Sequence, residues 1–235
     1  MCGRASLTKV EKGLEERFHA TFYSEDLERY NPLPNYNVAP TQMHPVITNT
    51  DPEHLQFFKW GLIPFWAKDE KIGSRMINSR IETILEKPAF RNAVNKRRCL
   101  VPFDGFYEWQ KTPSGKIPFR IILKDKGIFA VAGIWEKWKS PEGEEVFSFS
   151  VITQPPNALM ESIHDRMPAI LLPEQEQTWL DSDIPAEEAL KMVAPFPDEL
   201  LEAYTVSKRV NKVSENDSSL VEEYHHDDSP QGSLF

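Results

Sequence analysis

The chain has 235 residues, of which 40% are hydrophobic and 27% charged, a balance typical of a globular domain with one sizeable core. Its two cysteines are too few for a disulfide framework or a cysteine-based zinc site, and no apolar run approaches the roughly 18 to 20 residues needed to span a bilayer. The net charge of −9 argues at first against a nucleic-acid partner. Because no secretory signal follows Met1, we expect a soluble, cytoplasmic protein without a membrane partner.

The charges are unevenly distributed along the chain. Residues 1–120 contain 18 Lys or Arg and 14 Asp or Glu, whereas residues 121–235 contain 9 and 22. The first half is therefore mildly basic and the second half strongly acidic. This asymmetry is compatible with a local basic groove, although ordinary solvated surface explains it as well.

The first predicted element is a helix over Thr8–Ala20. Thr8 and Glu11 form a capping-box pattern, and apolar residues recur at every fourth position after them. The next segment, Asn31–Pro40, holds three prolines and three asparagines, so it is predicted to be a loop or a set of turns.

Short strands and helices alternate irregularly through the rest of the chain. The predicted strands are Pro45–Thr48, Leu55–Trp60, Cys99–Val101, Phe119–Leu123, Ile128–Ile134 and Val146–Ile152. The predicted helices are Ala158–His164, Glu174–Leu180 and Pro185–Val193. Without a βαβ rhythm, this mixture predicts an α+β fold with a mostly antiparallel, barrel-like sheet and flanking helices. We expect one domain over residues 1–221 and a disordered acidic tail over residues 222–235.

Cys2 is the first candidate for chemistry. Removal of Met1 would place an α-amine and a thiol on one residue, with ordinary pKa values of about 8 and about 8.5. Such an aminothiol can serve as an N-terminal nucleophile, or it can condense with an aldehyde to form a thiazolidine ring. On position alone, Cys2 is equally well explained as a small residue at a chain end.

Seven short motifs occur in a fixed order along the chain. They are Met1–Arg4, Asn37–Thr41, Trp60–Pro64 with Trp66, Ile77–Thr83, Arg98–Pro102, Gly105–Trp109 and Ile163–Pro168. Together they resemble the SRAP family (SOS response-associated peptidases, or abasic site processing proteins) from Cys2 to about residue 221. The resemblance implies a single SRAP-type domain in which trimmed Cys2 forms a thiazolidine with the ring-opened sugar of an abasic site in single-stranded DNA. Such a crosslink would shield the lesion during the DNA damage response.

Three further catalytic positions follow from this resemblance. Asn78 would hold the lesion or the terminal amine through its neutral amide. Glu108 lies among aromatic residues, so partial desolvation should raise its pKa into a useful acid/base range. Its alternative is a structural carboxylate paired with an arginine such as Arg80. His164 would transfer protons near neutral pH, or else be an ordinary structural histidine.

The DNA-binding positions implied by the resemblance are Arg4, Pro40, Trp66, Arg80 and Arg166. A guanidinium can grip a phosphate in a bidentate manner, but any of the three arginines could instead form a structural ion pair. Pro40 and Trp66 lie in loops that the family uses beside the DNA, where an exposed aromatic ring can stack on a base or at a single-strand/double-strand junction. Trp60 and Trp109 are predicted to pack in the core, and Cys99 to be buried and inert.

Two other functional classes are compatible with the sequence. One is an N-terminal-nucleophile cysteine peptidase or amidohydrolase, a class that includes a chain which removes only its own Met1. The resemblance to the family also implies a lyase-type activity. The other is a non-covalent single-strand binding module, which would not need Cys2. No metal or organic cofactor is implied. We expect a monomer, associated with the nucleoid if the source is a bacterium.

Overall fold

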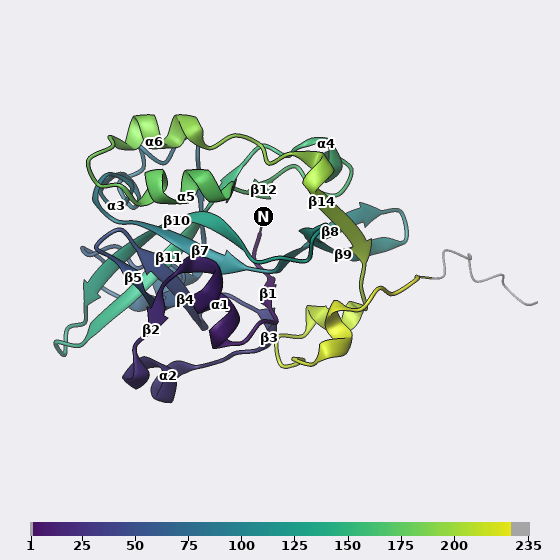
Figure 1. Cartoon of the computed structure of the whole chain (residues 1–235), viewed down its shortest axis with the longest axis horizontal. Helices are drawn as coiled ribbons and strands as arrows, with labels where there is room; N and C mark the ends of the chain where they lie inside the picture. The colour runs from purple at the N-terminus through teal and green to yellow at the C-terminus, as the bar shows by residue number, and fades with distance from the viewer. Residues whose placement is uncertain (1, 227–235) are drawn as a thin grey trace, which may run out of the picture.

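Two mostly antiparallel sheets build the molecule in the computed structural model, which describes residues 2–226 (Figure 1). The smaller sheet has the strand order β14-β9-β8-β1-β3. Its strands are β1 (Ala5–Leu7), β3 (Asn35–Val38), β8 (Gly105–Thr112), β9 (Gly115–Leu123) and β14 (Leu201–Thr205). Every pairing within it is antiparallel.

The larger sheet has the order β12-β11-β10-β7-β4-β5-β2. Its strands are β2 (Thr21–Phe22), β4 (Met43–Thr48), β5 (Asp51–Trp60), β7 (Arg98–Phe103), β10 (Phe129–Lys139), β11 (Glu145–Gln154) and β12 (Met167–Pro168). Two short strands are added to it, β6 (Asn78–Arg80) on β11 and β13 (Ile170–Leu171) on β10. The β2–β5, β5–β11 and β6–β11 pairings are parallel, and the others are antiparallel.

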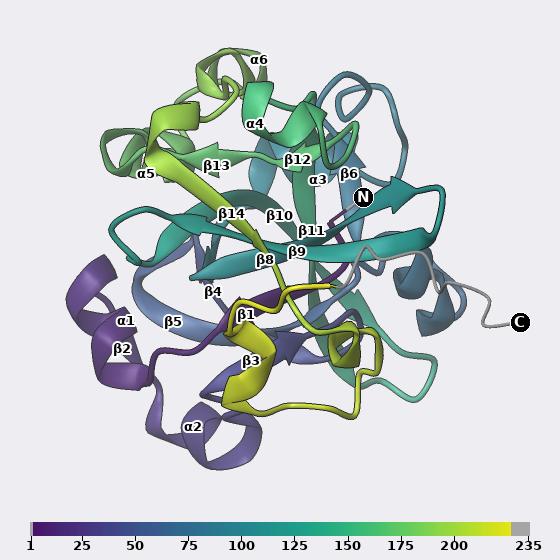
Figure 2. The same ribbon diagram turned by 90° about the vertical axis from the view of Figure 1, so that its right-hand side faces the viewer.

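The inner faces of the two sheets share one apolar core. Val38 and Phe106 of the smaller sheet pack in the same cluster as Trp60, Val101 and Phe149 of the larger one, and all five are buried. Figure 2 shows β8 and β9 crossing in front of β10 and β11. Each large apolar side chain buried in this way contributes about 1.5 to 3 kcal/mol. The α+β class with a barrel-like sheet is therefore confirmed.

Short helices cover the ends and edges of the sheets. The α-helices are α1 (Glu11–Phe18), α2 (Ser24–Tyr30), α3 (Arg91–Lys96), α4 (Ala158–Glu161), α5 (Pro173–Leu180) and α6 (Ala186–Met192). The 3-10 helices are η1 (Glu70–Arg75), η2 (Asp198–Leu200), η3 (Lys208–Asn211) and η4 (Ser218–Val221). No helix within residues 2–226 is long and apolar enough to cross a membrane.

The capping box predicted for the first helix is wrong. Helix α1 begins at Glu11 after Val10, and no side chain caps it. Thr8 is instead engaged by a distant carboxylate, because its backbone N–H (2.6 Å) and its hydroxyl (2.5 Å) both donate to Asp104 Oδ2. A tertiary contact has thus replaced the local one.

Three other boundaries differ from the sequence-based expectations. The segment predicted as a loop contains β3, which pairs with β1. The predicted helix at Ala158–His164 is a single turn, α4. Residues 222–226, assigned to the disordered tail, lie along β14: Tyr224 N–H donates to Thr205 O (2.8 Å), and Thr205 Oγ1 donates to Tyr224 O (2.7 Å). The rest of that predicted tail, residues 227–235, lies outside the described residues.

Candidate active site

Cys2 lies just before β1 and is fully buried in the core that the two sheets share. Asn78, the first residue of β6, donates from Nδ2 to the carbonyl oxygen of Cys2 (2.8 Å). Burial raises the pKa of the Cys2 thiol, and the nearby carboxylate of Glu108 raises it further. The thiol is therefore protonated at neutral pH and needs a base before it can act as a nucleophile.

Glu108 is placed to serve as that base. It lies in the middle of β8, opposite Phe119 of β9, with only 2% of its surface exposed. Burial raises the pKa of this carboxyl from 4.5 to about 7, so near neutral pH it exists as acid and base in similar amounts. Within residues 2–226, Glu108 and Arg80 form no ion pair with each other.

His164 connects this carboxyl to the solvent. Its Nε2 lies 3.7 Å from Glu108 Oε2, and its side chain is 23% exposed. The backbone N–H of Arg166 donates to Nδ1 (3.1 Å), which assigns the proton of the neutral ring to Nε2, facing Glu108. Burial lowers the pKa of His164, while Asp165 Oδ1, 3.0 Å from Nδ1, favours the charged ring. A histidine so placed can relay protons to and from Glu108.

Asn78 completes the group with an acceptor. Its Oδ1 is buried and takes no hydrogen bond from any residue between 2 and 226. A buried amide oxygen without a donor is energetically unfavourable, so it is ready to accept one from a ligand. An amine or a hydroxyl group would be a suitable donor. The structure thus brings Cys2, Asn78, Glu108 and His164 together.

Two polar side chains that support this group were not predicted. Gln110 lies on the same side of β8 as Glu108, and its Nε2 donates to Ser162 O (2.8 Å), just before His164. Asn157 caps α4 by accepting from Met160 N–H (3.0 Å), which fixes the turn that leads to His164. The two-residue spacing from Glu108 could have drawn attention to Gln110. Nothing in the local sequence distinguishes Asn157.

The predicted core tryptophan Trp60 has a role in positioning as well. It is fully buried, as expected, and its Nε1 donates to Ile77 O (3.0 Å), immediately before Asn78. Trp109 is only half-buried and donates to Asn211 Oδ1 (2.7 Å). Cys99 is fully buried, and burial raises the pKa of its thiol, which agrees with an inert residue.

The three predicted phosphate-binding arginines differ in their surroundings. Arg80 is exposed on β6, and its guanidinium makes no hydrogen bond or ion pair within residues 2–226. Arg166 is held by both carboxylate oxygens of Glu82 (2.5 and 3.0 Å) and by Thr153 O (2.6 Å), with 11% of its side chain exposed. These contacts match the structural ion pair considered as its alternative. Arg4 is likewise occupied by internal oxygen atoms, described below.

An exposed aromatic pair, Phe65 and Trp66, precedes η1 and β6 in the chain. Phe65 and Trp66 are 56% and 49% exposed. They line a hollow of about 630 Å³ together with Pro88, Arg91, Asn92 and Asn95. Exposed aromatic faces beside a cation, here Arg91, are suited to the stacking of a nucleobase.

Pro40 lies in a rigid turn between β3 and β4. It is half-buried and precedes Thr41, whose φ of 73° is unusual for a β-branched residue. Thr41 N–H donates to Trp60 O (2.8 Å), which holds the turn against the end of β5.

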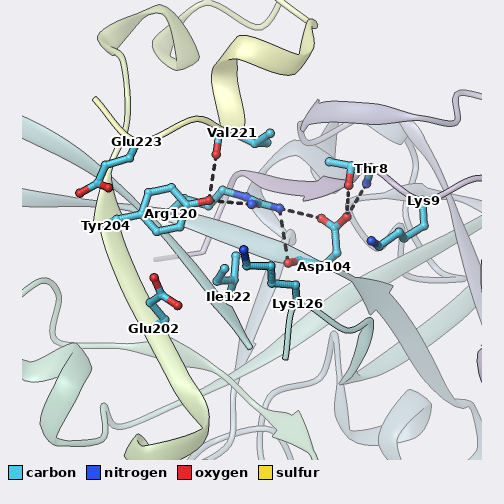
Figure 3. A pocket seen from close by; sticks show the side chains of 10 residues that line it. All are labelled: Thr8, Lys9, Asp104, Arg120, Ile122, Lys126, Glu202, Tyr204, Val221 and Glu223. Carbon is cyan, nitrogen blue, oxygen red and sulfur yellow. Dashed lines mark hydrogen bonds and ion pairs between the residues drawn. The ribbon is translucent and has the colours of Figure 1, made fainter. Parts of the chain in front are cut away.

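A second hollow, of about 390 Å³, lies elsewhere, against the outer face of the smaller sheet (Figure 3). Its buried charges are already paired: Asp104 accepts hydrogen bonds from Ser6 (2.7 Å), Thr8 and Arg120 (3.1 Å). Arg120 in turn donates to Tyr204 OH (2.8 Å). Because these buried groups satisfy one another, they read as a structural network rather than a ligand site.

Comparisons with known proteins place the chain in a family. The family model described as SOS response associated peptidase (SRAP) matches residues 1–213. The abasic site processing protein YoqW of Bacillus subtilis (strain 168) is 43% identical over 227 residues, covering 95% of this chain and all of that protein. The abasic site processing protein HMCES of Xenopus tropicalis is 30% identical over 259 residues, covering 92% and 76% of the two chains.

A solved structure has the same fold. A crystal structure of a protein from Bacteroides thetaiotaomicron is similar with a TM-score of 0.87 and 33% identity, over 95% of this chain and all of the other. The match of the family model over most of the chain, together with these relatives, shows that the chain belongs to the SOS response-associated peptidase (SRAP) family.

Proposed function

We propose that this protein recognises abasic sites in single-stranded DNA and bonds to them covalently through Cys2 once Met1 has been removed. The observation that carries the proposal is the grouping of a buried thiol with a buried carboxyl whose pKa is about 7 and a histidine 3.7 Å from that carboxyl. The names of the relatives, abasic site processing proteins, point to the same substrate.

The chemistry begins with the α-amine of trimmed Cys2. Its lone pair attacks C1 of the ring-opened sugar aldehyde, and the resulting carbinolamine loses water to give an imine. Protonated Glu108 supplies the proton that the departing hydroxyl needs. The lesion thus becomes attached with the net loss of one water molecule.

The thiol then closes the ring. Its sulfur adds to the imine carbon while its proton passes to ionised Glu108, and the imine nitrogen takes up a proton to become the ring amine. His164 exchanges protons between Glu108 and the solvent, which resets the carboxyl between steps. Asn78 fixes the Cys2 backbone through the 2.8 Å hydrogen bond to its carbonyl, so that amine and thiol approach the same carbon.

The flanking DNA would be held mainly outside this group. Arg80, whose side chain forms no ion pair within residues 2–226, offers a cation for a phosphate, and Trp66 with Phe65 offers a stacking surface for an unpaired base. Pro40 would lie against the strand at a duplex end. Enclosed in this way, the lesion is shielded from strand cleavage and from copying.

The test compares the wild-type protein with Cys2→Ser and Cys2→Ala on an oligonucleotide with one abasic site. Wild type should give a heat-stable crosslink without reductant, Cys2→Ser a crosslink only when borohydride reduces the imine, and Cys2→Ala no ring. A heat-stable crosslink from Cys2→Ser equal to that of wild type would refute the role of the thiol. If wild type forms no crosslink but cleaves amide or ester substrates, the N-terminal-nucleophile hydrolase is the correct function.

A further inference from the structure

The last described part of the chain, residues 206–226, packs against β3 and β9 on the outer side of the smaller sheet (Figure 2). We call this segment the C-terminal strap. It contains η3 and η4 and lies on the face of β8 that carries Tyr107, whose ring packs with Val206 and Val210. Glu108 and Phe106 alternate with Tyr107 along β8 and therefore point to the opposite face, toward Cys2.

The strap holds the start of the chain at Arg4. The guanidinium Nη1 of Arg4 donates to Asn37 Oδ1 (2.8 Å) and to Val210 O (2.5 Å). Asn37 is 1% exposed, and its Nδ2 donates to the strap carbonyls of Lys212 (2.9 Å) and Glu215 (2.8 Å). One arginine and one buried amide thus join β1, β3 and the strap.

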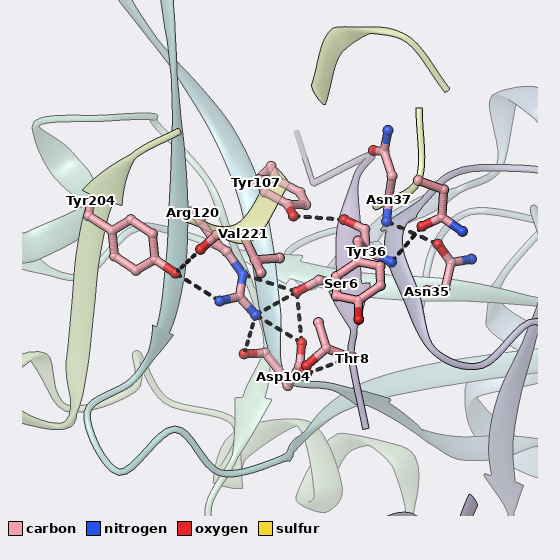
Figure 4. Close-up of polar contacts among 11 residues, drawn as sticks. Ser6, Thr8, Asn35, Tyr36, Asn37, Asp104, Tyr107, Arg120, Tyr204 and Val221 are labelled. Carbon is pink, nitrogen blue, oxygen red and sulfur yellow. Dashed lines mark hydrogen bonds and ion pairs between the residues drawn. The ribbon is translucent and has the colours of Figure 1, made fainter. Parts of the chain in front are cut away.

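A second connection lies two residues further along the chain, at Ser6 of β1 (Figure 4). Ser6 Oγ donates to Asp104 Oδ1 (2.7 Å) and accepts from Arg120 Nη2 (2.9 Å). Arg120 donates to Tyr204 OH, which in turn donates to Val221 O of the strap (2.8 Å for each). The first strand is therefore fixed to the strap on both sides of Ala5.

The backbone of Arg4 is itself part of the Cys2 environment. Its carbonyl oxygen accepts from Tyr107 N–H (2.9 Å), and its own N–H favours the thiolate form of Cys2 and so lowers the pKa of that thiol. Chain ends fray unless side chains hold them, and Cys2 is only two residues from Arg4. A displacement of about 1 Å at a reacting group can slow a reaction about a hundredfold.

We infer that Arg4 and Asn37 form a clasp that positions the Cys2 nucleophile from the back of the sheet, and that Arg4 is a positioning residue rather than a phosphate ligand. The guanidinium faces the strap, on the side of β8 opposite Glu108, and both of its recorded acceptors belong to the protein. This inference rests on the proposed crosslinking function and adds residues to it that do not touch DNA.

The test measures crosslinking by Arg4→Ala and Asn37→Ala over a range of concentrations of an abasic single-stranded oligonucleotide. Each variant should lower the rate constant at saturating oligonucleotide at least about tenfold, with the half-saturating concentration within twofold of wild type. The double variant should be little slower than either single one, because the two side chains act as a unit. Arg17→Ala is the matched control: it breaks an equally internal arginine contact, to Glu176 and Ile128 O, far from Cys2, and should leave the rate unchanged.

Two results would overturn the inference. The first is an Arg4→Ala variant that reacts at the normal rate at saturation but binds DNA more weakly. If the slope of log affinity against log salt concentration were also lower by about 0.7, the variant would have lost a phosphate contact. The second is a normal rate for folded Asn37→Ala, since this buried residue cannot reach DNA. Thermal melts of every variant identify those that are folded. If Asn37→Ala unfolds, the rate is measured on Asn37→Asp, which keeps the acceptor for Arg4 but loses the donors to the strap.

A second readout separates this inference from the proposed function. Alkylation of Cys2 by iodoacetamide, followed by peptide mass mapping against buried Cys99, needs no DNA. The clasp predicts faster alkylation of Cys2 in both variants than in wild type, with Cys99 unchanged. Faster alkylation of Cys2 in both variants, with no crosslink by the wild-type protein, would refute the proposed function but not the clasp. Unchanged alkylation of Cys2 would refute the clasp.

Discussion

Replacing Glu108 with glutamine should change both the stability of the protein and the pH dependence of its reaction. The carboxyl is 2% exposed, and burial raises its pKa from 4.5 to about 7. At about 1.4 kcal/mol for each tenfold change, ionising it in the folded protein costs about 3 kcal/mol more than in the unfolded chain. Because its pKa is raised, the carboxyl of Glu108 binds protons more tightly in the folded state than in the unfolded chain. Its contribution to the free energy of unfolding is therefore full below pH 4.5 and is lost as the pH rises to about 7.

The glutamine variant lacks this titration. All other groups titrate alike in the two proteins. In urea unfolding, the free energy of unfolding of Glu108→Gln minus that of wild type should therefore be about 2 to 3 kcal/mol higher at pH 8 than at pH 5. Ring closure needs ionised Glu108, so the wild-type rate of ring closure should rise through pH 7, and the variant should be about a hundredfold slower and lack that inflection. Parallel stability curves, or an unchanged inflection in the variant, would refute the assignment of the proton relay to Glu108.

Three further predictions concern the neighbouring residues. Asn78→Ala removes the 2.8 Å hydrogen bond to the Cys2 carbonyl and should slow single-turnover crosslinking about tenfold at unchanged affinity; weaker binding at a normal rate would contradict this. Trp66→Ala should weaken binding of undamaged single-stranded DNA by about 1 to 3 kcal/mol in fluorescence anisotropy without lowering the melting temperature, and unchanged affinity would exclude stacking. Arg80→Ala should lower the slope of log affinity against log salt concentration by about 0.7. Arg166→Ala should leave that slope unchanged and lower the melting temperature, because it breaks the ion pair with Glu82. The opposite result for the two variants would mean that Arg166 binds the phosphate and Arg80 does not.

The sequence predicted the five longer strands of the larger sheet, β4, β5, β7, β10 and β11, because each contains a run of β-branched, aromatic or other apolar residues. β1 and β3 were not predicted, since three- and four-residue strands carry too little periodicity, and β3 lies among prolines that usually mark a loop. The capping box failed for a related reason. The carboxylate that binds Thr8 belongs to Asp104, 96 residues further along the chain.

The site was predicted unevenly. The motifs indicated Cys2 and Asn78, and the aromatic flanks of Glu108 correctly predicted the burial that raises its pKa. They gave no information on the partners of Arg4, which lie 33 and 206 residues away. Arginine side chains serve phosphates and carbonyl groups with the same donors, so only the fold distinguishes the two uses.

The most direct measurement of the central claim is the intact mass of the product formed with an oligonucleotide that carries one abasic site, after separation on a denaturing gel. The account predicts one species whose mass equals the protein without Met1 plus the oligonucleotide minus one water molecule, and no such species with undamaged DNA. A protein confirmed to begin at Cys2 that gives only the separate masses of protein and oligonucleotide would contradict it.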